Sequence, residues 1–306
     1  MEIARFGDDE DILDIRRDNV FKAVFTRDTE LSRKALSSLV SACIGRAVDI
    51  EGITANEPAP DSAGDRQIRY DISCKTTDGK RVNVEMSLNP DPFEPERLEY
   101  YASKLLVSQN IKGGDRGYDD LKPTFQIAVL AQRRFFGDDE FFHAFEQYDP
   151  ERGVSLGGKA RIVTLELSKL KGVARKPVEE MGNRELWAMF FGYQSDPRMR
   201  PAINAIMGRE EGIAMAGQVL MGLSRDEAER ARLTSEFKYE MDMQSKVKHA
   251  RLEGEMRGEK RGEKRGEKRG VEATARNALA EGASPEFVQK ITGLDVETIA
   301  RLQAGG

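Results

Sequence analysis

Residues 66–88 read RQIRYDISCKTTDGKRVNVEMSL, and this stretch decides the fold. Apolar and polar residues alternate strictly on both sides of Asp78-Gly79, which predicts two antiparallel strands joined by a tight turn. A two-residue turn would place the apolar sets of the two strands on opposite faces. A three-residue turn that ends in a left-handed Gly79 pairs Thr76 with Lys80 and puts every apolar residue on one face. Because the hydrophobic pattern fixes strand register, we expect the three-residue turn.

The same register sets Asp71 directly opposite Glu85. Two facing carboxylates with Cβ atoms roughly 5 Å apart repel each other and destabilise a sheet. Such a pair persists where something offsets the repulsion, and Mg²⁺ commonly binds one or two carboxylates together with water and a substrate phosphate. The pattern therefore indicates a metal site. The alternative is that both side chains lie on a solvated sheet face beside Arg69 and Arg81.

Hydrophobic periodicity divides the chain into an α/β domain and a C-terminal extension. Residues 1–170 alternate helical and strand patterns, which predicts a sheet flanked by helices. Residues 171–250 have a helical pattern throughout. A charged repeat follows at 251–270, and 271–306 form a small helical cap with two short helices around a glycine turn.

The repeat has a glycine at every fourth position from Gly254 to Gly270. In a helix each interior glycine costs about 1 kcal/mol relative to alanine, and like charges recur four residues apart. Three interpretations stay open for this segment: a flexible linker, an oligomerising helix whose glycines let two helices approach closely, or a contact with the DNA backbone. We expect any homo-oligomer to form through this C-terminal helical region.

Short motifs flank the hairpin on both sides. They are DNVFKAVF (18–25), RLEYYASKLLVSQ (97–109), GYDDLKPTFQIAVL (117–130), LELSK (165–169) and ITGLDVETIARL (291–302). Together with Asp71 and the later Glu85-Met86-Ser87, this ordered set resembles the bacterial Rpn-type family of recombination-promoting nucleases and transposases. That family is part of the PD-(D/E)XK nuclease superfamily, and the resemblance covers most of the chain.

The resemblance implies an α/β fold of the restriction-endonuclease type, with a mixed central sheet flanked by helices and a helical C-terminal extension. It also implies that the chain is a DNA endonuclease linked to recombination or mobile elements. Asp71 and Glu85 would hold Mg²⁺, or Mn²⁺ in its place, for hydrolysis of a phosphodiester bond.

One position departs from the family pattern. The superfamily usually has lysine two residues after the glutamate and this family usually has glutamine, but the chain has Ser87. Serine can hydrogen-bond a water or a phosphate but carries no positive charge. We expect Lys104 to substitute for the missing lysine. Arg97, Tyr101 and Lys104 share one helix face, and the resemblance places this helix beside the active site, where the three could contact DNA. The alternative is an amphipathic helix whose cations point into water.

The other titratable residues give weaker indications of a functional role. Asp18 and Lys22 are interpreted as structural, although related folds sometimes supply an additional acidic ligand from this N-terminal helix. His143 and His249 are the only histidines and lie far apart in the sequence, which gives little support to a histidine mechanism or a zinc site.

Composition limits the classes of protein to which the chain could belong. The 306 residues are 33% charged with a net charge of −5, which is typical of a globular protein rather than a strongly basic nucleic-acid coat. No apolar run approaches the roughly 20 residues of a membrane helix, and the acidic N-terminus lacks the order of a secretory signal. We therefore expect a cytoplasmic protein that acts on DNA. The rival hypothesis is a DNA-binding or assembly protein that kept the fold and lost the chemistry; an RNA substrate also stays open.

Overall fold

The computed structural model describes residues 5–54, 69–109, 111 and 117–304. It divides into two compact units, Met1–Phe237 and Lys238–Gly306. None of the helices in the described ranges is long and apolar enough to cross a membrane.

The first unit is built on a six-stranded sheet in the order β1-β2-β3-β4-β6-β5. Strands β3, β4 and β6 are parallel to one another, whereas β1, β2 and β5 pair antiparallel to their neighbours. The strands are β1 (Ile50–Ile53), β2 (Ile72–Thr76), β3 (Arg81–Ser87), β4 (Thr124–Leu130), β5 (Phe142–Phe145) and β6 (Ala160–Glu166). The expected mixed central sheet is therefore confirmed.

The β2–β3 hairpin has the predicted register. Ile72 pairs with Val84 and Lys75 with Arg81. The Thr76 N–H donates to the Lys80 carbonyl at 3.0 Å, and the turn between them contains a glycine with φ of 84°. The three-residue turn is thus confirmed, and the same register extended by one pair puts Asp71 opposite Glu85.

One residue of the hairpin departs from the prediction. Tyr70 was expected on the same face as Ile72, but it packs against Leu105 and Tyr101 on the opposite side of the sheet. The regular strand begins only at Ile72, and the chain bends at Asp71. Strict alternation therefore stops one residue before the sequence pattern does.

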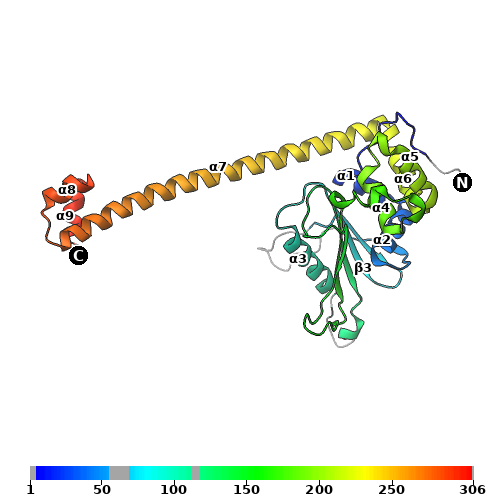
Figure 1. Cartoon of the computed structure of the whole chain (residues 1–306), viewed down its shortest axis with the longest axis horizontal. Coiled ribbons are helices and arrows are strands. Elements are labelled where there is room, and N and C mark those ends of the chain that lie inside the picture. Colours follow the sequence, from blue (N-terminus) through cyan, green and yellow to red (C-terminus); the bar gives the residue numbers. More distant parts are fainter. Residues whose placement is uncertain (1–4, 55–68, 110, 112–116, 305–306) are drawn as a thin grey trace. The chain divides into compact units, whose positions relative to one another are not determined.

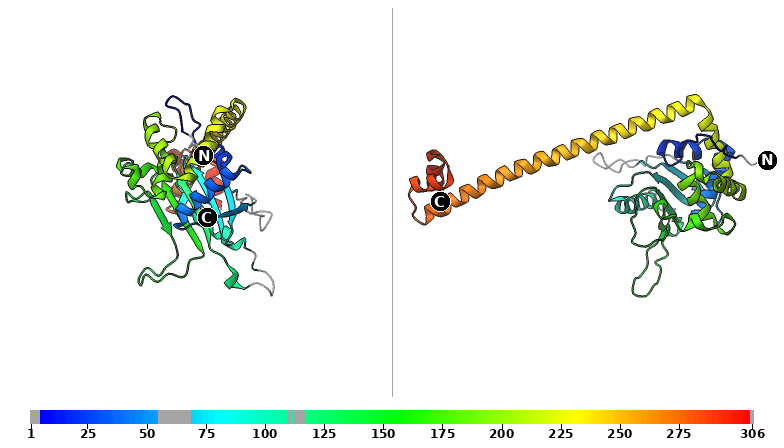
Figure 2. Two further views of the ribbon diagram at one scale, coloured as in Figure 1. Left: turned by 90° about the vertical axis from the view of Figure 1, so that its right-hand side faces the viewer. Right: turned by 45° about the horizontal axis from the view of Figure 1, so that its top comes forward.

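Helices cover both faces of the sheet (Figures 1 and 2). One face, with Ile127 and Val129 of β4, shares a core with several helices. These include α1 (Asp18–Phe25), α2 (Glu30–Ile44), α4 (Asn183–Tyr193), α5 (Arg200–Arg209) and α6 (Glu211–Arg225). On the other face, Ala128 and Leu130 pack against Leu98 of α3 (Glu94–Val107). Alternate residues of β4 thus contribute to two different layers.

The larger core joins segments that are distant in the sequence. Trp187 of α4 is fully buried and its indole N–H donates to Ser38 of α2 at 3.1 Å. Its ring lies 5.9 Å from Phe25 of α1 and 5.4 Å from Phe191. The helices that follow the sheet in sequence therefore complete its hydrophobic core.

Short 3₁₀ turns connect these elements. They are η1 (Tyr118–Asp120), η2 (Leu167–Lys169), η3 (Val173–Arg175), η4 (Val178–Glu180) and η5 (Pro197–Met199).

The second unit is helical. Helix α7 (Glu227–Ala280) begins within the first unit and is followed by α8 (Pro285–Thr292) and α9 (Val296–Ala304). Its small core consists of Ala275, Val288, Ile299 and Leu302. The charged repeat lies inside α7, so this segment is helical and the interpretation as a flexible linker is wrong. The glycines of the repeat have open space where a Cβ atom would lie.

Candidate active site

The two predicted metal ligands meet at the end of the β2–β3 hairpin. The Asp71 carboxylate accepts a hydrogen bond from the backbone N–H of Met86 at 3.1 Å, which holds it across from Glu85. The Glu85 side chain is only 3% exposed and that of Asp71 18%. The alternative of a solvated sheet face is therefore wrong: this carboxylate pair is largely removed from water.

Cations and donors from three elements surround the pair. Lys22 Nζ of α1 lies 3.1 Å from Asp71 Oδ1. Arg97 of α3 lies 3.0 Å from Glu85 Oε2. Asn83 on the same strand donates to Glu85 Oε1 at 2.9 Å. All four carboxylate oxygens thus have a partner within the chain, so a metal ion would compete with Lys22 and Arg97 for these oxygens.

Burial and mutual repulsion disfavour the charged forms of both acids. Burial, with the nearby Asp18 carboxylate, raises the pKa of Asp71 to about 6. Burial and the charge of Asp71 raise the pKa of Glu85 to about 8, although Arg97 acts in the opposite direction. The site therefore has a deficit of positive charge, which a bound divalent cation would supply.

A pH dependence of stability follows. We expect the metal-free protein to lose stability as pH rises, because folded Asp71 and Glu85 keep protons that the unfolded chain releases above about pH 4. The loss continues until the pH passes the raised pKa of Glu85, about 8. Urea unfolding in chelator at about pH 5 and about pH 9 measures the difference in free energy. An equal or higher stability at the alkaline pH would contradict the repulsive pair.

Lys22 is held in place by a second acid on its own helix. Its Nζ lies 2.7 Å from Asp18 Oδ2, four residues earlier on α1. Burial alone would lower the pKa of Lys22, but Asp71 and Asp18 raise it, so the ammonium stays charged. The other oxygen of Asp18 is buried without a hydrogen-bond partner among the described residues.

Helix α3 contributes Arg97 and Tyr101. Its first turn contains Pro95 and the acidic Glu94 and Glu96, which suit a helix N-terminus. Arg97 contacts Glu94 at 2.5 Å as well as Glu85, and its guanidinium lies 5.3 Å from the centre of the Tyr101 ring. Burial and the charge of Glu85 raise the pKa of the Tyr101 hydroxyl.

The structure brings four of the predicted residues together: Asp71, Glu85, Arg97 and Tyr101. Ser87 ends β3 two residues beyond Glu85 and is half-buried. The contact described for Lys104 is with the ring of Tyr100, 5.9 Å from its Nζ to the ring centre. Sequence reasoning did not predict that Lys22 and Asn83 contact the two carboxylates. Two signals were available. Lys22 follows Asp18 by four residues, and Asn83 lies on the same strand face as Glu85.

The comparison with protein families decides the class. The model of the PD-(D/E)XK nuclease family transposases matches residues 15–250. The chain belongs to this family. The match spans well over half of the chain and contains every residue of the site described above. Searches of curated proteins and of solved structures gave no match.

The donor set of this nuclease-family site fits magnesium. Asp71 and Glu85 offer hard carboxylate oxygens, and the buried, unpartnered oxygen of Asp18 lies on the adjacent helix. Within the described ranges no group of three or more His, Cys, Asp or Glu side chains is placed to hold a metal ion. Two carboxylates nevertheless suffice for Mg²⁺, which usually keeps several waters and shares a substrate phosphate.

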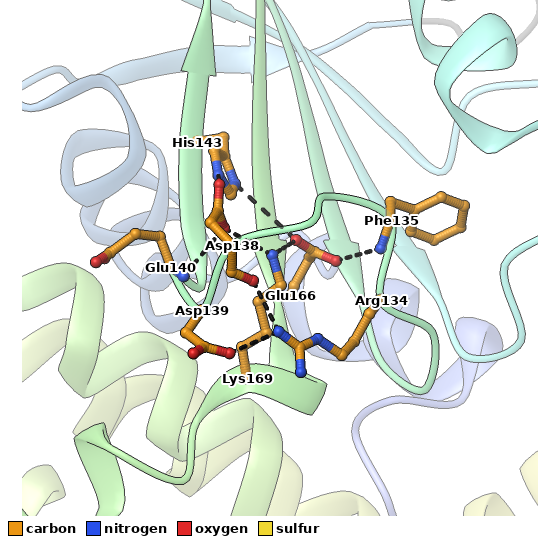
Figure 3. A network of polar contacts seen from close by, with 8 residues as sticks. All are labelled: Arg134, Phe135, Asp138, Asp139, Glu140, His143, Glu166 and Lys169. Atoms are coloured by element: carbon orange, nitrogen blue, oxygen red, sulfur yellow. Dashed lines mark hydrogen bonds and ion pairs between the residues drawn. The ribbon is translucent and has the colours of Figure 1, made fainter.

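The nuclease-family domain contains a second charged cluster at the end of β6 (Figure 3). Lys169, 1% exposed, contacts the fully buried Glu166 at 2.5 Å and Asp138 at 3.0 Å. His143 pairs with Asp138 at 2.9 Å, and Glu166 accepts from the Phe135 N–H at 2.6 Å. These contacts fasten the segment between β4 and β5 to the sheet, which accounts for His143 without a catalytic role.

Proposed function

We propose that this chain is a metal-dependent DNA endonuclease that hydrolyses phosphodiester bonds in the course of recombination or mobile-element activity. The observation that carries the proposal is the buried, facing pair of carboxylates Asp71 and Glu85. Burying two like charges against each other is costly. A protein without a use for them would be more stable with neutral side chains here.

In the proposed reaction Asp71 and Glu85 hold Mg²⁺, or Mn²⁺ in its place. The bound ion would lower the pKa of a water and offset negative charge on the phosphate. The Ser87 hydroxyl, two residues from Glu85, is able to hydrogen-bond the attacking water or a phosphate oxygen. Arg97 contacts Glu85, and the ring of Tyr101 lies against the Arg97 guanidinium. Lys104, which is half-buried and shares one face of α3 with Arg97 and Tyr101, remains our prediction for contact with the DNA backbone.

The domain plan and cellular context are proposals of the same kind. We assign the nuclease-like domain to residues 1–170, a helical extension to 171–250, the repeat to 251–270 and the cap to 271–306. Self-association, where it occurs, is expected through the C-terminal helices. Cys43 and Cys74 are both buried free thiols, which fits a cytoplasmic protein.

Cleavage of supercoiled plasmid DNA tests the proposal. We expect nicking by the wild type in Mg²⁺ or Mn²⁺, no nicking in chelator, and a loss of roughly 1,000-fold in Asp71→Asn. Asp119→Asn, on the exposed turn η1, is the matched control and should retain full activity. Folded wild type that cuts with neither metal would favour the rival hypothesis, a DNA-binding or assembly protein that kept the fold and lost the chemistry. A parallel reaction with RNA separates the two substrates.

A further inference from the structure

We propose that Lys22 of α1 supplies the positive charge that the motif strand lacks at Ser87, an inference that rests on the proposed nuclease function. A lysine beside the carboxylates can stabilise negative charge on a phosphate as the bond breaks. With serine at position 87, this charge must come from another element. Two cations contact the carboxylate pair within the described residues, Lys22 on Asp71 and Arg97 on Glu85.

Arg97 already contacts two acids. The same guanidinium nitrogen contacts Glu85 at 3.0 Å and the buried Glu94 at 2.5 Å. The remaining face of the group lies over Tyr101. A guanidinium held between two acids and a ring serves as a fixed counter-ion. Arg97 is therefore a positioning residue for Glu85.

Lys104 lies on the same helix but its described contact is elsewhere. Its Nζ is 5.9 Å from the centre of the Tyr100 ring, and Tyr100 is 44% exposed. Tyr101, by contrast, lies against the guanidinium of Arg97, which contacts Glu85. The described contact of Lys104 is thus with an exposed ring rather than with the carboxylate pair, which suits a contact with the DNA backbone better than one with the scissile phosphate.

Lys22 lies beside the carboxylates and has a hydrogen-bond donor left for a substrate. Its helix is anchored by Val20, Phe21, Val24 and Phe25, all fully buried, so the root of the side chain is fixed. The side chain itself is 28% exposed, so part of it is accessible from solvent. An ammonium has three donors. Asp71 and Asp18 take two of them, at 3.1 Å and 2.7 Å, and the third is directed to no described residue.

The chemistry of lysine suits this task. Its ammonium is a compact point charge on a flexible stem, able to turn between an acid and a phosphate oxygen. If Asp71 held a divalent ion, the Lys22 ammonium would no longer be needed to offset the charge of that carboxylate, and its contact with Asp18 would keep it in the site. Lys22 would then donate to the non-bridging phosphate oxygen or to the attacking water.

Cleavage kinetics with matched variants test the assignment. We expect Lys22→Met to lower kcat by about 100-fold or more, and Lys22→Arg, which keeps the charge, to lower it less. Lys34→Met should stay within about threefold of wild type. Lys34 is the control for helix charge, since it also forms an i,i+4 ion pair, with the exposed Glu30 on α2. The double variant Lys22→Met/Ser87→Lys should recover at least about tenfold, because the charge returns to the motif strand.

A readout without turnover separates this proposal from the nuclease proposal. Binding of a DNA duplex is measured in Ca²⁺, with thermal unfolding as the check on folding. We expect Lys22→Met to weaken binding by roughly tenfold, and Ser87→Lys to restore it. If wild type cuts and Lys22→Met cuts equally well, Lys22 is not the missing charge although the nuclease function stands. If wild type does not cut, the nuclease proposal fails. Unchanged DNA binding in Lys22→Met would then overturn the phosphate contact as well.

Discussion

Glu85→Gln is expected to abolish metal-dependent cleavage and, at the same time, to stabilise the metal-free protein. Activity should fall by about 1,000-fold or more, because an amide oxygen is a much weaker ligand for Mg²⁺ than a carboxylate. Stability should rise because burial and Asp71 raise the pKa of Glu85 and so disfavour its charge in the folded state. Glutamine keeps the shape and can still accept from Asn83.

The loss of the Arg97 contact opposes this gain, but two features limit the cost. Arg97 keeps its contact with Glu94 at 2.5 Å, and the net effect of all neighbours on Glu85 is a raised pKa. We therefore expect a gain of at least about 1 kcal/mol at alkaline pH. The gain should shrink toward about pH 5, where wild-type Glu85 is itself protonated.

Urea unfolding in chelator, repeated with Mg²⁺, measures both effects in one series. Wild type should be stabilised by the ion and Glu85→Gln should not. Glu96→Gln, an exposed residue in the first turn of α3, is the matched control and should behave as wild type. A destabilised Glu85→Gln protein in chelator at pH 9 would mean that the Arg97 ion pair outweighs the repulsion from Asp71.

Much of the carboxylate site could be predicted because a hairpin is a local structure. Alternation along both arms and one glycine turn determine the register, and the register alone sets Asp71 against Glu85. The prediction failed at Tyr70, where the chain leaves the strand. Alternation in sequence cannot reveal a bend of this kind, since the bend depends on the packing of Tyr70 against Leu105.

The cations of the site were harder to predict because they come from other elements. Helical periodicity correctly grouped Arg97 with Tyr101, but it could not say which part of the α3 face lies over the sheet end. Lys104 was expected at the carboxylates because periodicity grouped it with Arg97 and Tyr101 and the family resemblance placed this helix beside the active site. Lys22 was interpreted as structural because its partner Asp71 lies 49 positions away in sequence, and only the packing of α1 on the sheet brings them together.

The active-site pair and the Glu166 cluster represent two opposite solutions for a buried acid. Asp71 and Glu85 face each other and remain short of positive charge. Glu166 is equally buried but has its own lysine within 2.5 Å. The first arrangement would gain stability if an ion bound, whereas the acid of the second already has its cation. We therefore expect neutralising substitutions to have opposite effects on stability at the two places.

Lys169→Met is accordingly expected to destabilise the protein strongly, with or without Mg²⁺. It leaves Glu166, which has no exposed surface, without its cation; the nearest other candidate, His143, lies 4.0 Å away. Removing one partner of a buried ion pair typically costs 3–5 kcal/mol. We expect about 3 kcal/mol, at the lower end of that range, because Asp138 on the outer side of the cluster is half-exposed and open to solvent.

The double variant Lys169→Met/Glu166→Gln shows whether stability is lost because the Glu166 charge is left unpaired or because packing is lost. Once Glu166 is neutral, its amide can still accept from the Phe135 N–H, so more than half of the lost stability should return. Lys176→Met, which breaks a partly exposed pair with Glu185, is the matched control and should cost less than about 1 kcal/mol. If the double variant were no more stable than Lys169→Met, the packing of the buried lysine side chain rather than its charge would hold this segment to the sheet.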